Sequence, residues 1–191
     1  SYKSEPQFAH SNVTYLNGDL RSRDFCYEIV NEIDYVFMCA ANSSGAGDIK
    51  GTPLIHLASN VQMNTNMLEA SHERKVKKFL FISSSTVYPP GIRPMSENDV
   101  NNNYFQDYYA VGWMKRFTEV MCGIYSNQKK LPLETVVIRP GNLYGPFDKF
   151  DPKKSKVIPA LIRKLSSNSS ELSVWGDGKD IKDFIYIDDF I

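Results

Sequence analysis

The stretch Phe79-Leu80-Phe81-Ile82-Ser83-Ser84-Ser85 decides the fold class of this chain. Its four apolar residues predict a strand buried on both faces, as in a parallel sheet, and its serines begin where that strand ends. Similar strands are predicted at Tyr35–Ala41, before the small residues of Asn42–Gly47, and at Thr135–Ile138, before Pro140-Gly141-Asn142. Each of these strands therefore ends in small or polar residues.

Helical patterns separate the predicted strands. Apolar residues recur at three- and four-residue steps over Leu54–His72 and Asp24–Asn31, and again after Asp107, the expected N-cap of a helix ending near Ser126. A short first strand is predicted at Val13–Leu16. Parallel neighbours need crossover connections, so strands alternating with helices favour a parallel sheet covered by helices. We therefore expect an α/β fold with a doubly wound parallel sheet, whose ligands bind beyond the carboxyl ends of the strands.

A second group of elements is predicted after this pattern. We expect a helix at Ser155–Ser166, strands at Leu172–Trp175 and Phe184–Ile187, and a turn at Gly176-Asp177-Gly178 between the two strands. No internal repeat links the two groups.

The chain contains no G-x-G-x-x-G turn, the motif that holds the pyrophosphate of a dinucleotide at a helix N-terminus. Gly45 and Gly47 follow the second predicted strand and lack the third glycine. Two alternatives follow: the cofactor is not a dinucleotide, or the chain is a fragment.

Composition excludes several classes of protein. Lys plus Arg and Asp plus Glu number 22 each, which indicates no general affinity for nucleic acid or anionic membrane. No apolar run approaches the roughly 18 residues of a membrane span, and Ser1–His10 does not resemble a signal peptide. Three distant cysteines without metal-ligand spacing favour a reduced, cytoplasmic protein with no metal site.

Four motifs in a fixed order carry a resemblance to a known family. They are Phe81–Pro89, Gly112-Trp113-Met114-Lys115, Arg139–Pro146 and Asp183–Asp189. Together they resemble the extended short-chain dehydrogenase/reductase family of nucleotide-sugar epimerases and dehydratases. The residues of these motifs are most similar to those of its GDP-L-fucose synthase and UDP-galactose 4-epimerase branches.

The resemblance implies a Rossmann-like fold that lacks its first strand, turn and helix and much of its C-terminal substrate domain. Residues 1–140 would then be a partial NAD(P)-binding Rossmann domain, and residues 141–191 a partial nucleotide-sugar-binding region. Both divisions are expectations from the family.

The activity that the resemblance implies is that of an NAD(P)-dependent nucleotide-sugar epimerase or epimerase/reductase, with hydride transfer at a sugar carbon. NAD or NADP would be the cofactor and a nucleotide-diphosphate sugar the substrate. Ser84-Ser85-Thr86 stands where 4,6-dehydratases usually carry Thr-Asp-Glu, which disfavours elimination of water. Family members often form homodimers through the helices that would carry Trp113 and Phe117, although core packing is an equal alternative for these two residues.

The resemblance also implies a role for individual residues. Ser84 takes the role of the hydroxyl that bonds the reacting oxygen, and Lys115 that of the lysine that favours a tyrosine phenolate and holds the nicotinamide ribose. Thr86 would face the same way as Ser84 if the strand continued. Cofactor contacts are implied for Asp19, Leu20, Ala40, Ala41, Asn60, Lys115 and Pro140, and substrate contacts for Thr86, Asn142 and Lys182.

One position departs from the family pattern, because Val111 stands four residues before Lys115, where the catalytic tyrosine is expected. At about 100° per residue, Tyr108 lies within roughly 20° of Lys115 around a helix but about 10 Å away along it, and Tyr109 lies roughly 120° away. Tyr108 is our candidate for the base, with Tyr109 as the alternative. A catalytically impaired relative that only binds nucleotide sugar or cofactor is the other hypothesis.

Overall fold

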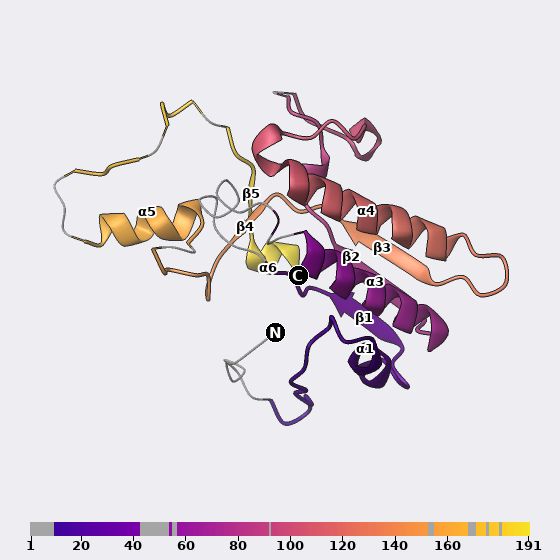
Figure 1. The fold of residues 1–191 in the computed structure, drawn as a ribbon. Helices are drawn as coiled ribbons and strands as arrows, with labels where there is room; N and C mark the ends of the chain where they lie inside the picture. The colour runs from indigo at the N-terminus through magenta and orange to yellow at the C-terminus, as the bar shows by residue number, and fades with distance from the viewer. Residues whose placement is uncertain are drawn as a thin grey trace.

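The computed structural model describes residues 10–42, 54, 57–91, 93–152, 155–167, 171–174, 176–179 and 181–191 of the chain. Helices and strands alternate through most of it, as Figure 1 shows. The first group comprises α1 (Arg23–Ile29), β1 (Tyr35–Met38), α3 (Ala58–Glu73), β2 (Lys78–Ile82), α4 (Tyr109–Ser126) and β3 (Glu134–Ile138). The second group comprises β4 (Asn142–Tyr144), α5 (Val157–Leu165), β5 (Phe184–Tyr186) and α6 (Ile187–Phe190).

The main sheet has the order β1-β2-β3, and both pairs of strands are parallel. Met38 pairs with Phe81, which in turn pairs with Val137, so the carboxyl ends of the three strands lie at one edge. The parallel α/β fold predicted from the alternating pattern is thus confirmed. A smaller parallel sheet pairs β4 with β5.

Helices α3 and α4 pack against each other and cover one face of the main sheet, while α1 packs against α3 (Figure 1). Successive side chains of a strand point to opposite faces, so alternate residues enter the core beneath these helices. Phe79 and Phe81 are the largest side chains of this core, and α3 contributes Met63, Met67 and Leu68.

The prediction that the strands are buried on both faces was wrong for β1. Tyr35 and Phe37 are 58% and 69% exposed, whereas Val36 and Met38 between them are buried. The physical reason is the alternation of side chains, because α3 and α4 lie on one face and no described helix covers the other. A continuous apolar run does not by itself say on how many faces a strand is covered.

Two predicted strands did not form in the described part of the chain. Val13–Leu16 and Leu172–Val174 have no strand assignment, and their apolar side chains are largely exposed. A strand exists only where a neighbour accepts its hydrogen bonds, and no described strand pairs with either segment. Trp175 and the predicted Ser43–Gly47 loop lie outside the described residues.

The boundaries of several elements also differ from the predictions. β1 ends at Met38, three residues before its predicted end at Ala41, and α3 begins at Ala58 instead of Leu54. β5 ends at Tyr186, because Ile187 already belongs to α6. Strand β4 was not predicted, since its three residues Asn142–Tyr144 are too few to produce a pattern.

Helix α4 begins later than predicted. A 3-10 turn at Gln106–Tyr108 precedes it, and Tyr108 is its N-cap, without a side-chain capping bond. The prediction of Asp107 as N-cap was therefore wrong, because Asp107 lies inside the 3-10 turn, which is closed by the amide of Tyr108 donating to the carbonyl of Phe105 (2.9 Å). The predicted end at Ser126 is confirmed.

No helix in the described part of the chain is long and apolar enough to cross a lipid bilayer. The longest, α4, has 18 residues and includes Lys115, Arg116 and Glu119.

The one-sided burial of the sheet predicts different costs for two phenylalanines in neighbouring strands. Phe79→Ala should lower the free energy of unfolding by about 3–5 kcal/mol, because it empties a fully buried site. Phe37→Ala, the matched control, should change it by less than about 0.5 kcal/mol. Urea denaturation followed by circular dichroism measures both, and equal losses would mean that the second face of the sheet is covered in solution.

Candidate active site

Ser84 lies where the carboxyl ends of β2 and β3 are joined. The amide of Ser83 donates to the carbonyl of Ile138 (2.7 Å), and the amide of Ser85 donates to the carbonyl of Pro140 (3.1 Å). These two bonds flank Ser84 and fix its backbone at the edge of the sheet. Its hydroxyl oxygen accepts a bond from the amide of Thr86 (3.2 Å), and the side chain is half-buried.

Lys115 extends from α4 to the same edge of the sheet. Its ammonium group donates to the carbonyl of Ile82 (2.6 Å) and lies 4.8 Å from the centre of the Phe81 ring. Met38, the last residue of β1, pairs with Phe81, so the residues that follow the pair are Cys39 and Ile82. Cys39 is exposed. Ser84 and Lys115, predicted to act together, are thus brought to one strand end.

Burial lowers the pKa of Lys115 to about 8, and the nearby Glu119 carboxylate and Cys39 thiol oppose this shift. The cause is the loss of hydration, which penalises the charged form of a lysine. Lys115 therefore loses its proton near pH 8, where a solvated lysine stays charged.

Gly112 allows α4 to approach the segment that follows β2. A Cβ atom at Gly112 would lie 2.8 Å from the carbonyl oxygen of Thr86 and 2.9 Å from the ring of Tyr104. The absence of a side chain at this position is therefore a packing requirement. It brings the turn that carries Ser84 and Thr86 against the helix that carries Lys115.

Thr86 does not continue the strand, so the expectation that it faces the same way as Ser84 was built on a wrong premise. β2 ends at Ile82, and Ser85–Val87 forms a 3-10 turn. The hydroxyl of Thr86 is buried and has no hydrogen-bond partner within the described residues. A buried hydroxyl without a partner is costly, which marks Thr86 as a group with bonding capacity left for a ligand.

The candidate tyrosines lie at the start of α4. Tyr108 is half-buried with its ring 6.0 Å from that of Phe105, whereas Tyr109 is 48% exposed and packs edge-on against Tyr104. Neither hydroxyl bonds to Lys115 among the described contacts. Val111, in the first turn of α4, is half-buried and carries no group that could exchange a proton.

The turn that contains Asp19 and Leu20 is held by α3. The side-chain amide of Asn66 donates to the carbonyls of Leu20 (3.1 Å) and Arg21 (2.9 Å). Asp19 pairs with the Arg21 guanidinium at 2.6 Å, and these hydrogen bonds lower the pKa of Asp19 to about 2. Both side chains are about half exposed, and exposed pairs of this kind are weak. A ligand could therefore take over either partner.

Asn60 is 2% exposed, as expected for a buried asparagine beside the site. Its amide oxygen accepts from the backbone amide of Asn42 (2.7 Å), and its amide nitrogen donates to the carbonyl of the same residue (3.0 Å). Asn60 thus holds the loop after β1. Ala40 and Ala41, in that loop, are exposed and present no bulk at the edge of the sheet.

Two of the predicted substrate residues come close through the smaller sheet. The side-chain amide of Asn142 donates to the carbonyl of Asp183 (2.9 Å), next to Lys182, whose side chain is exposed. Pro140 is half-buried, and its carbonyl is already used by Ser85.

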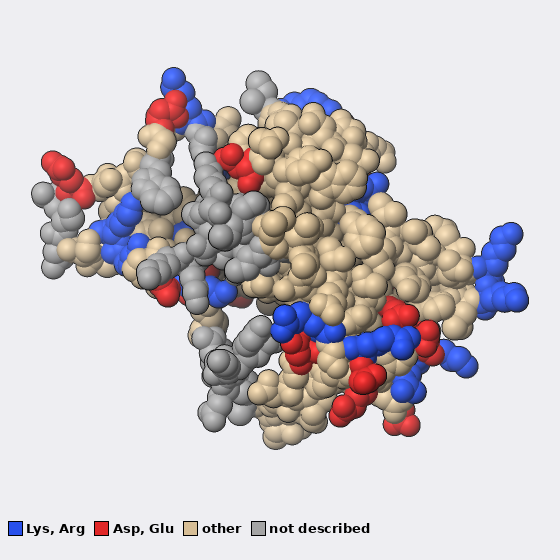
Figure 2. Space-filling model, viewed as in Figure 1, with Lys and Arg blue, Asp and Glu red and all other residues tan. Residues whose placement is uncertain are grey.

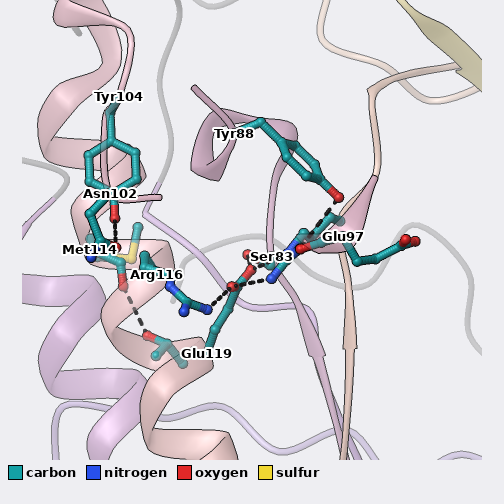
Figure 3. A network of polar contacts seen from close by, with 10 residues as sticks. Ser83, Tyr88, Glu97, Asn102, Tyr104, Met114, Arg116 and Glu119 are labelled. Atoms are coloured by element: carbon teal, nitrogen blue, oxygen red, sulfur yellow. Dashed lines mark hydrogen bonds and ion pairs between the residues drawn. The ribbon is translucent and has the colours of Figure 1, made fainter. Parts of the chain in front are cut away.

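A buried polar network beside the site was not predicted (Figure 3). Glu119 accepts hydrogen bonds from Ser83, Arg116 and Arg139. Burial raises the pKa of its carboxyl, but the bonds from Arg139 and Ser83 outweigh this, so that the net shift is downward. The only signal in the sequence was spacing, since Glu119 lies one helical turn after Lys115.

A parallel α/β sheet with polar side chains at its carboxyl edge is typical of doubly wound folds, which bind their ligands at that edge. Residues 1–191 match the model of the NAD dependent epimerase/dehydratase family. The chain belongs to this family.

Relatives of known name agree with this assignment. The chain is 33% identical to GDP-mannose 3,5-epimerase 1 of Oryza sativa subsp. indica, over 100% of this chain and 50% of that protein. It is 32% identical to GDP-L-fucose synthase of Escherichia coli K12, over 82% of this chain and 50% of that protein. The chain thus spans about half the length of the curated relatives that it matches.

Solved structures show the same similarity. A GDP-L-fucose synthetase from Naegleria fowleri bound to NADP matches with a TM-score of 0.77 and 27% identity, over 88% of this chain and 57% of that one. UDP-N-acetylglucosamine 4-epimerase from Methanobrevibacter ruminantium matches with a TM-score of 0.78 and 29% identity, over 93% and 55%.

The environment of Lys115 predicts an unusual titration. Its rate of acylation should rise with pH to a midpoint near 8, because burial favours the neutral amine. Lys78 is the control, since its ion pair with Glu134 raises its pKa above the ordinary value. Mass spectrometry of each acylated peptide across a pH series measures both, and a Lys115 midpoint near the ordinary value of about 10.4 would contradict the burial.

Proposed function

We propose that this chain carries the active site of an NAD(P)-dependent nucleotide-sugar epimerase or epimerase/reductase that transfers a hydride at a sugar carbon. The observation that carries the proposal is that Ser84 and Lys115 both lie at the carboxyl edge of the main sheet. Both residues belong to segments that match the family's motifs. The names of the relatives, which include epimerases and GDP-L-fucose synthases, support it.

The residues at the sheet edge suit a nicotinamide cofactor, NAD or NADP. We propose that Lys115 and Pro140 hold its nicotinamide end, that Ala40 and Ala41 leave room for close approach beside the buried Asn60, and that Asp19 and Leu20 contact its adenine end. Ala40 and Ala41 support this fit because they are exposed and small where β1 ends. When bound, the cofactor would supply the hydride acceptor or donor.

The protein's own part in the reaction would be to hold the sugar and move its proton. Ser84 would donate a hydrogen bond to the reacting oxygen, and the ammonium of Lys115 would favour the ionised form of a nearby tyrosine. We assign the proton transfer to Tyr108. Support comes from the place of Tyr108 at the N-cap of α4, because a residue outside the regular turns can direct its side chain differently from a residue inside the helix.

The nucleotide sugar would lie between the two sheets. We propose that residues 1–140 serve the cofactor and residues 141–191 the substrate. Thr86 offers its unpartnered hydroxyl, and Asn142 and Lys182 lie at paired strands of the smaller sheet. A lysine at position 182 can neutralise a diphosphate as a point charge but cannot bond it in a bidentate manner.

Turnover of a GDP- or UDP-sugar with NAD or NADP, followed by nicotinamide absorbance and product analysis, tests the proposal. Tyr108→Phe should lower kcat by about 100-fold or more and remove the acidic limb of the pH-rate profile, along which the base becomes protonated, because a phenyl ring cannot exchange a proton. Tyr109→Phe, the matched control, should keep both. The opposite pattern would transfer the role to Tyr109.

The absence of any turnover would favour the second hypothesis, a relative that binds nucleotide sugar without converting it. Val111→Tyr then separates the two cases, because it restores the family's spacing to Lys115. Turnover gained in this variant would identify a disabled enzyme. Saturable nucleotide-sugar binding without any gain would identify a binding protein.

We also propose that two copies of the chain form a homodimer through α4. Five exposed side chains form one stripe along this helix, at steps of three and four residues: Tyr109, Trp113, Phe117, Val120 and Ile124. Figure 2 shows a broad uncharged surface over α4 in the view of Figure 1. Exposed apolar stripes of this kind are typical of interfaces.

We propose the cytoplasm as the location of the protein, as expected from its distant cysteines.

The dimer proposal predicts that Phe117→Glu converts a dimer to a monomer, because it puts a charge in the centre of the apolar stripe. Phe37→Glu, on the open face of the sheet, should leave the mass unchanged. Sedimentation equilibrium at several protein concentrations measures both variants. A monomeric parent chain, or dissociation by the Phe37 variant alone, would contradict the proposal.

A further inference from the structure

We propose that Glu119 is a positioning residue, which sets Lys115 and Ser84 in place relative to each other. Glu119 contacts the three elements whose ends form the candidate site. This inference rests on the proposed function for its catalytic meaning, but the contacts that carry it are independent of any turnover.

The first contact joins α4 to the end of β2. The hydroxyl of Ser83 donates to Oε1 of Glu119 (2.6 Å), and one residue earlier the carbonyl of Ile82 accepts from Lys115 (2.6 Å). The last residue of β2 and the residue that follows it are therefore held by two residues one turn apart on α4. Two such contacts fix the position of α4 along β2, whereas a single contact would still allow the helix to turn about it.

The second contact joins α4 to the end of β3. Arg139 donates through Nε to Oε1 (2.9 Å) and through Nη2 to Oε2 (2.8 Å) of Glu119, so that the pair is bidentate. Bidentate pairs of arginine and carboxylate fix orientation as well as distance. Arg139 immediately precedes Pro140, and the carbonyl of Pro140 accepts from Ser85. The segment that carries Ser84 is thus held from both sides.

The burial of Glu119 makes these contacts obligatory. Its side chain is 3% exposed, and Arg116 donates a further bond to Oε2 (3.0 Å), as the labelled residues of Figure 3 show. A carboxylate cannot remain ionised in such a place without partners. Any shift of α4 along the strands would break several of these bonds together.

Glu119 also acts on Lys115 through its charge. The titratable groups that face Lys115 are Glu119, on its own helix, and Cys39, after β1. Glu119 favours the ammonium form, and it neutralises Arg139 and Arg116, whose positive charges would otherwise disfavour that form. Removal of the carboxylate charge should therefore make Lys115 easier to deprotonate.

Glu119→Gln in the 191-residue chain tests the proposal, with Glu134→Gln as the matched control. Glu134 is likewise paired with a basic side chain, that of Lys78, but it is 63% exposed and lies at the opposite end of β3. The acylation midpoint of Lys115, measured by mass spectrometry, should fall by about one pH unit in Glu119→Gln. It should stay unchanged in Glu134→Gln.

Glu119→Asp keeps the charge but shortens the side chain by one methylene group, so it serves if the glutamine variant does not fold. The shorter side chain cannot pair with Ser83 and Arg139 as Glu119 does, so Arg139 is less well neutralised and the midpoint should move in the same direction by a smaller amount. An unchanged midpoint in a folded variant would overturn the proposal. So would a rise toward the value of a solvated lysine, because that result would mean that the site has opened and that Glu119 acts only as a structural support. The titration requires no turnover, so its outcome stays separate from that of the proposed function.

Discussion

The parallel pairing of β1, β2 and β3 is the constraint on which the rest of the structure depends. Parallel strands in one sheet all end at the same edge, so residues far apart in the sequence meet there. The same edge receives Lys115 from α4 and the loop held by Asn60. The candidate site is therefore a consequence of topology first and of individual side chains second.

Local patterns were enough to predict those parts of the fold that are determined locally. Helix α3 was predicted because its apolar residues recur at three- and four-residue steps, and strand β2 because its apolar residues form one short continuous run. Val13–Leu16 has an equally good pattern but no described partner strand, and pairing is a property of two segments. The open face of β1 was missed for a similar reason, because the sequence of one strand does not show whether other elements cover one or both of its faces.

In the candidate site, too, some features could be predicted from the sequence and others depend on contacts between distant segments. Ser84 and Lys115 were proposed through the family resemblance, and the structure places both at the carboxyl edge of the main sheet. Asn60 was expected to be buried through the same resemblance, and it is. The network of Glu119 with Ser83 and Arg139 was not found, because its members come from three elements and only the folded chain brings them together. The start of α4 was missed because a 3-10 turn and an α-helical turn have nearly the same local sequence preferences. That start matters for the assignment of the base at Tyr108.

The exposed Tyr35 and Phe37 have a consequence for how the chain behaves at high concentration. They lie on β1, which is an edge strand of the main sheet in the described part of the chain. The backbone groups on the outer side of this strand therefore lie next to exposed aromatic side chains. Exposed edges of this kind are templates for aggregation. The lifetime of the purified chain will therefore depend on how fast it self-associates through this strand, a kinetic property that is separate from the free energy of unfolding.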